Sequence, residues 1–195
     1  EASMFCVIAL FLAPLGPVIV AGHQIALNVV SLLFMLPLSI GMALTLRVSF
    51  LMGARAAETA RLISRSSLIL AAATALVFAT LLFIFSREIA ALYTSDSDVQ
   101  AVTVRLPTFA ALFQIADVIQ VTCISALRGY KDTRIPMLVN LIAYWVVGLP
   151  LGYYLGIINN IGPIGLWVGL IAGLTVAAML HNIRFYRLTR RQLIG

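Results

Sequence analysis

The chain has 195 residues, of which 62% are hydrophobic and only 10% are charged, with a formal net charge of +6 and a mean hydropathy of +1.07. Soluble proteins carry about 45–50% apolar and about 25% charged residues, so an ordinary soluble domain is excluded. The basic balance does not indicate a nucleic-acid partner, because the Lys and Arg residues lie at the ends of apolar runs, where they act as topology signals.

Six apolar runs come close to the length of about 20 residues that a transmembrane helix needs. They predict an all-α integral membrane protein, a single membrane domain over residues 1–195, with spans at about 1–15, 22–46, 63–86, 106–127, 135–156 and 162–183. The first run covers only about 20 Å of a hydrocarbon core about 30 Å thick. It would leave Glu1 inside the membrane, so we expect the natural helix to begin upstream.

Basic residues gather on one side of these runs. The links after the second and fourth runs and the segment after the sixth hold Arg47, Arg55, Arg61, Arg65, Arg128, Lys131, Arg134, Arg184, Arg187, Arg190 and Arg191. The opposite side holds only Arg87 and Arg105. By the positive-inside rule, the first side is cytoplasmic, and residues 184–195 form a basic cytoplasmic tail.

Small residues recur at every fourth position in the last two runs. The positions are Gly148, Gly152 and Gly156, then Gly165, Gly169 and Gly173. Such ridges let two helix backbones approach closely in lipid, which predicts tight packing of these helices; the alternative is that glycine is simply frequent in membrane helices. Pro37 and Pro150 lie inside runs, and we expect each to kink its helix.

Polar side chains also recur at helical spacing inside the apolar runs. They are Gln24, Asn28 and Ser31 in the second, Gln114, Asp117 and Gln120 in the fourth, and Asn140 and Tyr144 in the fifth. Because polar groups need partners in lipid, we expect these stripes to face inward, toward one another or toward water. For the amides and hydroxyls, interhelical hydrogen bonding and ion binding both remain open.

Asp117 carries the most specific signal, because it is the only charged residue between Leu106 and Leu127 and lies at the middle of that run. A charge at the centre of a membrane helix costs about 2.5–3.5 kcal/mol on insertion scales, so an acid there is a functional-site hypothesis. We predict a proton carrier or a Na⁺ ligand, with Glu1 as a second carboxylate. Oxygen ligands suit a hard cation, whereas soft metals would need His or Cys clusters, and His23 and His181 lie on opposite sides of the membrane.

Enzyme motifs are absent from the sequence. It contains no HExxH, no nucleophile elbow and no phosphate-binding loop, and Cys6 and Cys123 lie in apolar runs without metal-ligand spacing. We therefore expect no enzymatic activity, and no cofactor other than a coupling ion.

Four segments resemble one transporter family. They are AGHQIALNVVSLLFMLPLSIGMALTLRV (21–48), FQIADVIQVTCISALRGYKDTR (113–134), AYWVVGLPLGYYLG (143–156) and GPIGLWVGLIAGL (162–174). Together they are similar to the C-terminal half of a MATE (multidrug and toxic compound extrusion) transporter of the NorM-like branch. The resemblance implies one six-helix lobe of a twelve-helix protein of the bacterial inner membrane. Such a protein exports cationic and amphipathic drugs in exchange for Na⁺ or H⁺, and its N-terminal lobe and the membrane lipid are the expected partners.

Carried over by position, the resemblance assigns the coupling cation to Asp117 and Glu1. The supporting and cavity positions are Gln24, Asn28, Phe34, Phe113, Gln114 and Gln120. Phe113 and Phe34 stand where some relatives carry an aromatic hydroxyl, which removes two oxygen ligands.

Two alternative functions remain. One is a flippase of lipid-linked saccharides, which favours several cationic residues in its cavity where this chain has none at membrane depth. The other is a structural membrane subunit in which Asp117 pairs with a partner helix.

Overall fold

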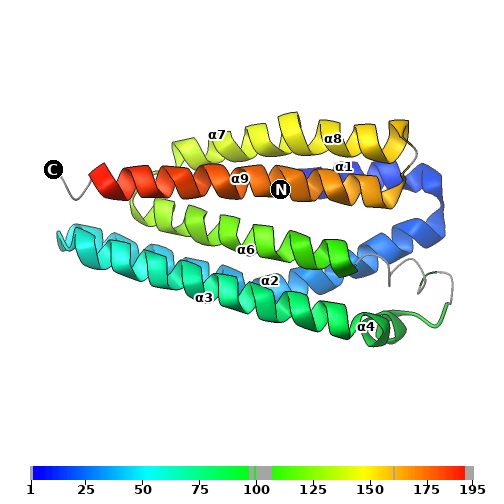
Figure 1. The fold of residues 1–195 in the computed structure, drawn as a ribbon, viewed down its shortest axis with the longest axis horizontal. Helices are drawn as coiled ribbons and strands as arrows, with labels where there is room; N and C mark the ends of the chain where they lie inside the picture. The colour runs from blue at the N-terminus through cyan, green and yellow to red at the C-terminus, as the bar shows by residue number, and fades with distance from the viewer. Residues whose placement is uncertain (1, 97–98, 100–106, 160, 192–195) are drawn as a thin grey trace.

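The protein is a bundle of long helices lying side by side in the computed structural model (Figure 1). The structure describes residues 2–96, 99, 107–159 and 161–191. The longest helices are α2 (Pro17–Gly53), α3 (Ala57–Ile84), α6 (Pro107–Gly129) and α9 (Pro163–Arg191). The shorter elements are α1 (Ala2–Leu12), the 3-10 helix η1 (Ala13–Leu15), α4 (Ser86–Tyr93), α7 (Arg134–Ile142), the π-helix η2 (Ala143–Gly148), α8 (Leu149–Tyr153) and the π-helix η3 (Tyr154–Ile158).

The all-α membrane fold is confirmed. Within the described residues, five helical stretches are long and apolar enough to cross a membrane: α2, α3, α6, the continuous run Arg134–Ile158, and α9. The predicted span 1–15 corresponds to α1 and η1, which end at Gly16, where φ is 108° and a side chain would be strained. With only 11 residues, α1 is too short to span by itself.

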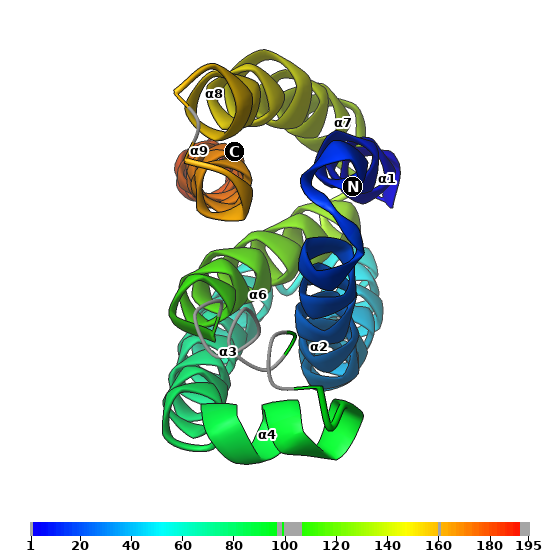
Figure 2. The same ribbon diagram turned by 90° about the vertical axis from the view of Figure 1, so that its right-hand side faces the viewer.

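Several helices extend beyond the predicted spans. α2 runs from Pro17 to Gly53, whereas hydropathy placed the second span at 22–46. α9 continues to Arg191, so residues 184–191 of the predicted tail are helical. Hydropathy marks only the part of a helix inside the hydrocarbon, while its backbone hydrogen bonds continue into the headgroup region. α4, which no apolar run indicated, lies across the ends of α2 and α3 (Figure 2).

α6 is the central helix of the bundle and lies between α2, α3 and α9 (Figure 2). In its most apolar window 72% of residues are buried, against 22% in both α2 and α3. The Thr45 hydroxyl of α2 donates a hydrogen bond of 2.8 Å to the Ser125 carbonyl of α6. A Cβ added to Gly129 would lie 2.6 Å from the Cβ of Val48, so this glycine permits the close approach of α6 to α2.

The glycine ridges do meet, as predicted. We call this contact the glycine seam; it consists of Gly148, Gly152 and Gly156 against Gly173, Gly169 and Gly165. A Cβ on Gly165 would lie 2.5 Å from the backbone nitrogen of Gly156. A Cβ on Gly169 would lie 2.4 Å from both the Cα and the backbone nitrogen of Gly152, which is too close for a real contact. Pairs of glycines in register therefore let α9 pack against the Arg134–Ile158 run backbone to backbone.

Proline affects two helices differently. Pro37 is buried inside the uninterrupted α2. Pro150 lies in α8, between the π-helices η2 and η3. Because proline has no N–H, it cannot make the usual hydrogen bond to the residue four positions earlier, and wider π turns are one way for a helix to accommodate the irregularity.

Candidate functional site

The polar stripe of α6 is buried inside the lobe. Asp117 is 3% exposed, Gln114 is fully buried, and Gln120 is 1% exposed. Their spacing of three residues places them on one face of α6, over about two turns. We call these three residues the polar face of α6. It faces the interior, as a polar stripe on an apolar helix must.

The polar pair on the fifth predicted span meets this face. The Gln120 side-chain nitrogen donates to the Asn140 amide oxygen at 3.0 Å and also to the Tyr144 hydroxyl. The Gln120 Oε1 atom and both amide atoms of Gln114 are buried and have no hydrogen-bond partner in the described part of the chain. Two buried amide oxygens on the same face as Asp117 thus remain available as acceptors or ligands.

Trp167 of α9 packs next to the polar face, against Phe113 and His23. Its indole is fully buried and meets the Phe113 ring edge to face, with ring centroids 5.8 Å apart and planes at 76°. The His23 imidazole of α2 meets the same indole at 5.8 Å and 75°. Phe113 precedes Asp117 by one turn, so this aromatic cluster fixes α2, α6 and α9 next to the acid.

His23 was not assigned to the site from the sequence. It is fully buried, and neither ring nitrogen has a hydrogen-bond partner among the described residues. His23, Ala26 and Val30 lie on one buried face of α2. The sequence alone does not show which face of α2 is buried, so it could not indicate that His23 lies next to the site.

The polar stripe of α2 does not join the polar face of α6. Gln24, Asn28 and Ser31 are all exposed, so of the two environments expected for the stripes, one another or water, this stripe does not have the first within the described chain. α2 instead buries the face that carries His23. The Asn28 amide oxygen accepts a hydrogen bond of 3.1 Å from the Tyr93 hydroxyl of α4, and Phe34 is half-buried.

Glu1, the predicted second carboxylate, lies outside the described residues. The helix that follows it packs at the site, because Ile8 and Leu12 of α1 belong to the same buried cluster as Phe113 and Trp167. The described part of the chain contains no group of three His, Cys, Asp or Glu residues that could hold a metal ion.

The charges of the described spans lie at their ends, with the exception of Asp117. In the described chain, the ion pair between Arg184 and Asp132, with Nε and Oδ2 2.7 Å apart, joins α9 to the loop after α6. We call this end of the bundle, where α2, α6 and α9 finish, the basic end. Asp117 instead lies near the middle of α6, away from the basic end, where a charge in a membrane helix is energetically costly.

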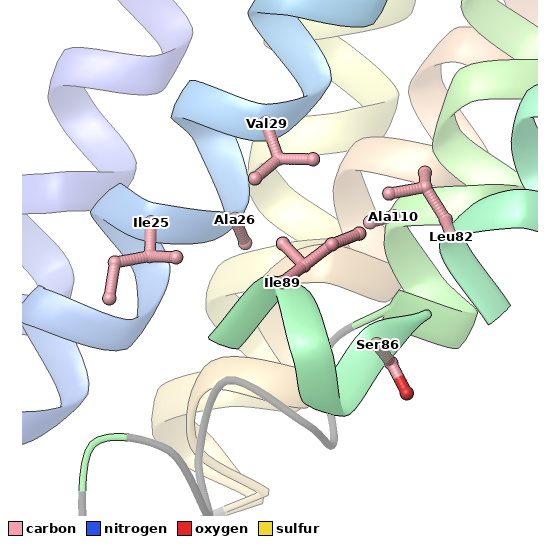
Figure 3. A pocket seen from close by; sticks show the side chains of 7 residues that line it. All are labelled: Ile25, Ala26, Val29, Leu82, Ser86, Ile89 and Ala110. Carbon is pink, nitrogen blue, oxygen red and sulfur yellow. The ribbon is translucent and has the colours of Figure 1, made fainter. Parts of the chain in front are cut away.

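A separate cavity near α4 has a different chemistry. Figure 3 shows its lining: Ile25, Ala26, Val29, Leu82, Ser86, Ile89 and Ala110. Every one of these side chains except Ser86 is apolar, and the Ser86 hydroxyl points away from the others (Figure 3). This cavity therefore lacks the oxygen ligands that a hard cation needs.

Sequence comparisons agree on one family. Residues 1–154 match the family MatE. The chain is 47% identical over 195 residues to multidrug resistance protein PmpM of Pseudomonas aeruginosa, covering 98% of this chain and 41% of that protein. It is 43% identical over 195 residues to multidrug resistance protein MdtK of Edwardsiella ictaluri, covering 98% and 43%. The chain thus spans less than half the length of these curated relatives.

Solved structures of MATE transporters share this fold. The eukaryotic MATE transporter AtDTX14 superposes with a TM-score of 0.89 at 22% identity, covering 97% of this chain and 44% of that one. The Vibrio cholerae MATE transporter VcmN in its bent form gives 0.85 at 19%, covering 98% and 43%. In each case the whole lobe, rather than a few helices, is superposed.

Proposed function

Because this chain belongs to the MatE family, we propose that it forms the C-terminal lobe of a secondary active multidrug exporter, which exchanges cationic and amphipathic drugs for Na⁺ or H⁺. The observation that carries the proposal is Asp117, an acid 3% exposed at the middle of the most buried helix of the bundle. It is a transporter and not an enzyme, and the coupling ion is its only inorganic ligand.

In this mechanism, Asp117 accepts the coupling cation. A proton would neutralise its carboxylate, whereas Na⁺ would take carboxylate oxygen together with amide oxygen from Gln114 or Gln120, both buried on the same face. Glu1 is the second acid of the site. The ion drives export only if it binds two conformations with different affinity, since a ligand that binds both equally shifts nothing.

The exposed stripe of α2 has a role in the same proposal. Gln24 and Asn28 lie on the face that α2 does not bury, and in this interpretation they line a central cleft. The chain covers 41–43% of its relatives, so a second six-helix lobe is the partner that closes the cleft. Drugs would enter between the lobes, and Phe34 would offer them an aromatic surface.

The proposed topology puts the basic end in the cytoplasm of a bacterial cell, with the lobe in the inner membrane. A reporter fused after Gly195 should be cytoplasmic, and one inserted near Asn159 should be periplasmic. Reversed labelling would contradict this orientation and the direction of transport.

The decisive experiment replaces Asp117 with Asn in the natural chain that contains these 195 residues. Asn keeps the size and most hydrogen bonds but removes the charge and the titrating proton. We expect normal membrane abundance and a loss of ion-driven drug efflux. Thr122→Val is the matched control, because Thr122 is also buried in α6 but donates only to the carbonyl of its own helix at Val118, at 2.8 Å.

Two outcomes would contradict the proposal. If Asp117→Asn protein exports drugs at the wild-type rate per molecule and still responds to the ion gradient, Asp117 is not the coupling acid. If abundance falls first and efflux falls only in proportion, Asp117 joins helices as part of a structural subunit. Flipping of a lipid-linked saccharide without drug efflux would identify the related flippase activity instead.

A further inference from the structure

We propose that one anionic phospholipid binds in a groove between α3, α6 and α9, with an acyl chain along the groove and its phosphate at Arg65. The groove consists of two cavities of about 530 and about 380 Å³ that share Ile119 and Asn182. The helices α3 and α9 lie on the edge of the bundle away from α1 and α2 (Figure 2). This site is separate from the polar face of α6 and requires only that the helices span a membrane.

Apart from Arg65, Ser66, Thr175 and Asn182, the side chains that line the groove are apolar or aromatic, which suits a hydrocarbon chain. α9 lines it from Ile171 to Tyr186, a distance of about 22 Å at about 1.5 Å per residue. One leaflet contributes about half of a hydrocarbon core about 30 Å thick, so the groove is long enough for one acyl chain. The Thr175 hydroxyl is satisfied by the Ile171 carbonyl at 2.7 Å, so this polar group adds little to the polarity of the wall.

The groove ends at a cluster of guanidinium groups. Arg65 is the one charged residue among those lining the two cavities, and its guanidinium carbon lies 5.6 Å from the centroid of the Tyr186 ring. Next to it is a cavity of about 220 Å³, lined by Glu58, Arg61, Leu62 and Arg65. The cluster thus carries two cations against one acid. A guanidinium can bind a phosphate through two parallel hydrogen bonds.

Neither Arg61 nor Arg65 forms an ion pair within the described structure. The ion pair found in that part of the chain joins Arg184 to Asp132, and the buried Nε of Arg61 has no hydrogen-bond partner there. Tyr186 is 44% exposed, as expected for a tyrosine at the boundary between headgroups and hydrocarbon. An apolar groove ending in excess positive charge at this depth complements an anionic phospholipid better than a zwitterionic one.

Native mass spectrometry of the detergent-purified natural chain tests the proposal. We titrate phosphatidylglycerol and phosphatidylcholine with matched acyl chains, and we expect tighter binding of phosphatidylglycerol. Near a membrane surface each arginine contributes about fivefold, so Arg61→Ala with Arg65→Ala should weaken phosphatidylglycerol binding by about 25-fold and remove the preference. Arg47→Ala is the matched control, because Arg47 lies over Phe50 at 5.8 Å near the basic end, but on α2.

A second variant tests the groove itself. Ile119 lines both cavities, so Ile119→Trp should fill the groove and weaken binding of both lipids while the guanidinium cluster stays intact. The proposal is overturned by equal binding of the two lipids to the unmodified protein, or by equal losses in the Arg61/Arg65 double variant and in Arg47→Ala. Unchanged binding in Ile119→Trp would overturn it as well. It is also overturned if a second copy of the chain, rather than lipid, occupies the groove.

Discussion

At the glycine seam, α9 meets its neighbour backbone to backbone, whereas it meets α6 through side chains, as Trp167 does with Phe113 beside the polar face. The seam leaves no room even for a methyl group at Gly165 or Gly169. The polar face contains buried amide oxygens, at Gln114 and Gln120, that have no hydrogen-bond partner in the described chain. A close-packed contact thus lies beside a polar face with unsatisfied acceptor atoms, and that second property suits the ion site that we propose there.

Trp167 links these two regions, and removing it should have the largest effect on stability. Trp167→Ala leaves a cavity between α2, α6 and α9, and we expect a loss of about 3–5 kcal/mol in the free energy of unfolding. Thermal unfolding in detergent measures it. Trp167→Phe keeps a ring opposite Phe113 and should recover much of the loss. If Trp167→Ala unfolds at the wild-type temperature, the aromatic cluster does not couple the two regions.

The seam itself should be the next most sensitive. In Gly169→Ala the new methyl group would fall on Gly152, and the helices must separate, which we expect to cost about 1–3 kcal/mol. Gly53→Ala is the control: nothing lies within 4 Å of its added Cβ, and removing a helical glycine should stabilise by about 0.5–1 kcal/mol. Equal melting temperatures for the two variants would show that the seam tolerates separation.

The polar face should contribute least. Gln120→Leu removes the hydrogen bonds to Asn140 and Tyr144, and such bonds average about 0.6 kcal/mol in membrane bundles, so we expect a loss of about 1 kcal/mol. The same melting assay checks it, with Thr122→Val as the near-neutral control. A loss as large as that of Gly169→Ala would mean that the polar face is structural and no more adaptable than the seam.

The seam could be predicted from the sequence because spacing alone encodes it. Glycines four residues apart on two successive apolar runs lie along one side of each helix, and this does not depend on the rest of the fold. In the structure, Gly152 packs against Gly169. The buried stripe of Gln114, Asp117 and Gln120 could be predicted for a similar reason, since one charge in an apolar run must avoid lipid. The role of Asp117 itself stays a prediction.

The remaining features depend on helix rotation, which hydropathy does not report. Both faces of α2 are apolar enough for lipid or for protein, so the sequence did not indicate that His23 would be buried against Trp167 while Gln24 remained exposed. α4 was missed because its eight residues are too few and too polar to produce an apolar run.

The π turns around Pro150 also set the register of the seam. In an α-helix four residues turn by about 400°, so a glycine at every fourth position drifts by about 40° per step. A π turn holds more residues per turn and drifts the other way, so η2 and η3 help to keep Gly148, Gly152 and Gly156 in line with their partners. Deleting one residue from η2 would let this segment return to an α-helix, in which the glycines would drift out of line with their partners on α9. The chain length between Tyr144 and Gly152 is therefore constrained as strongly as the side chains along it.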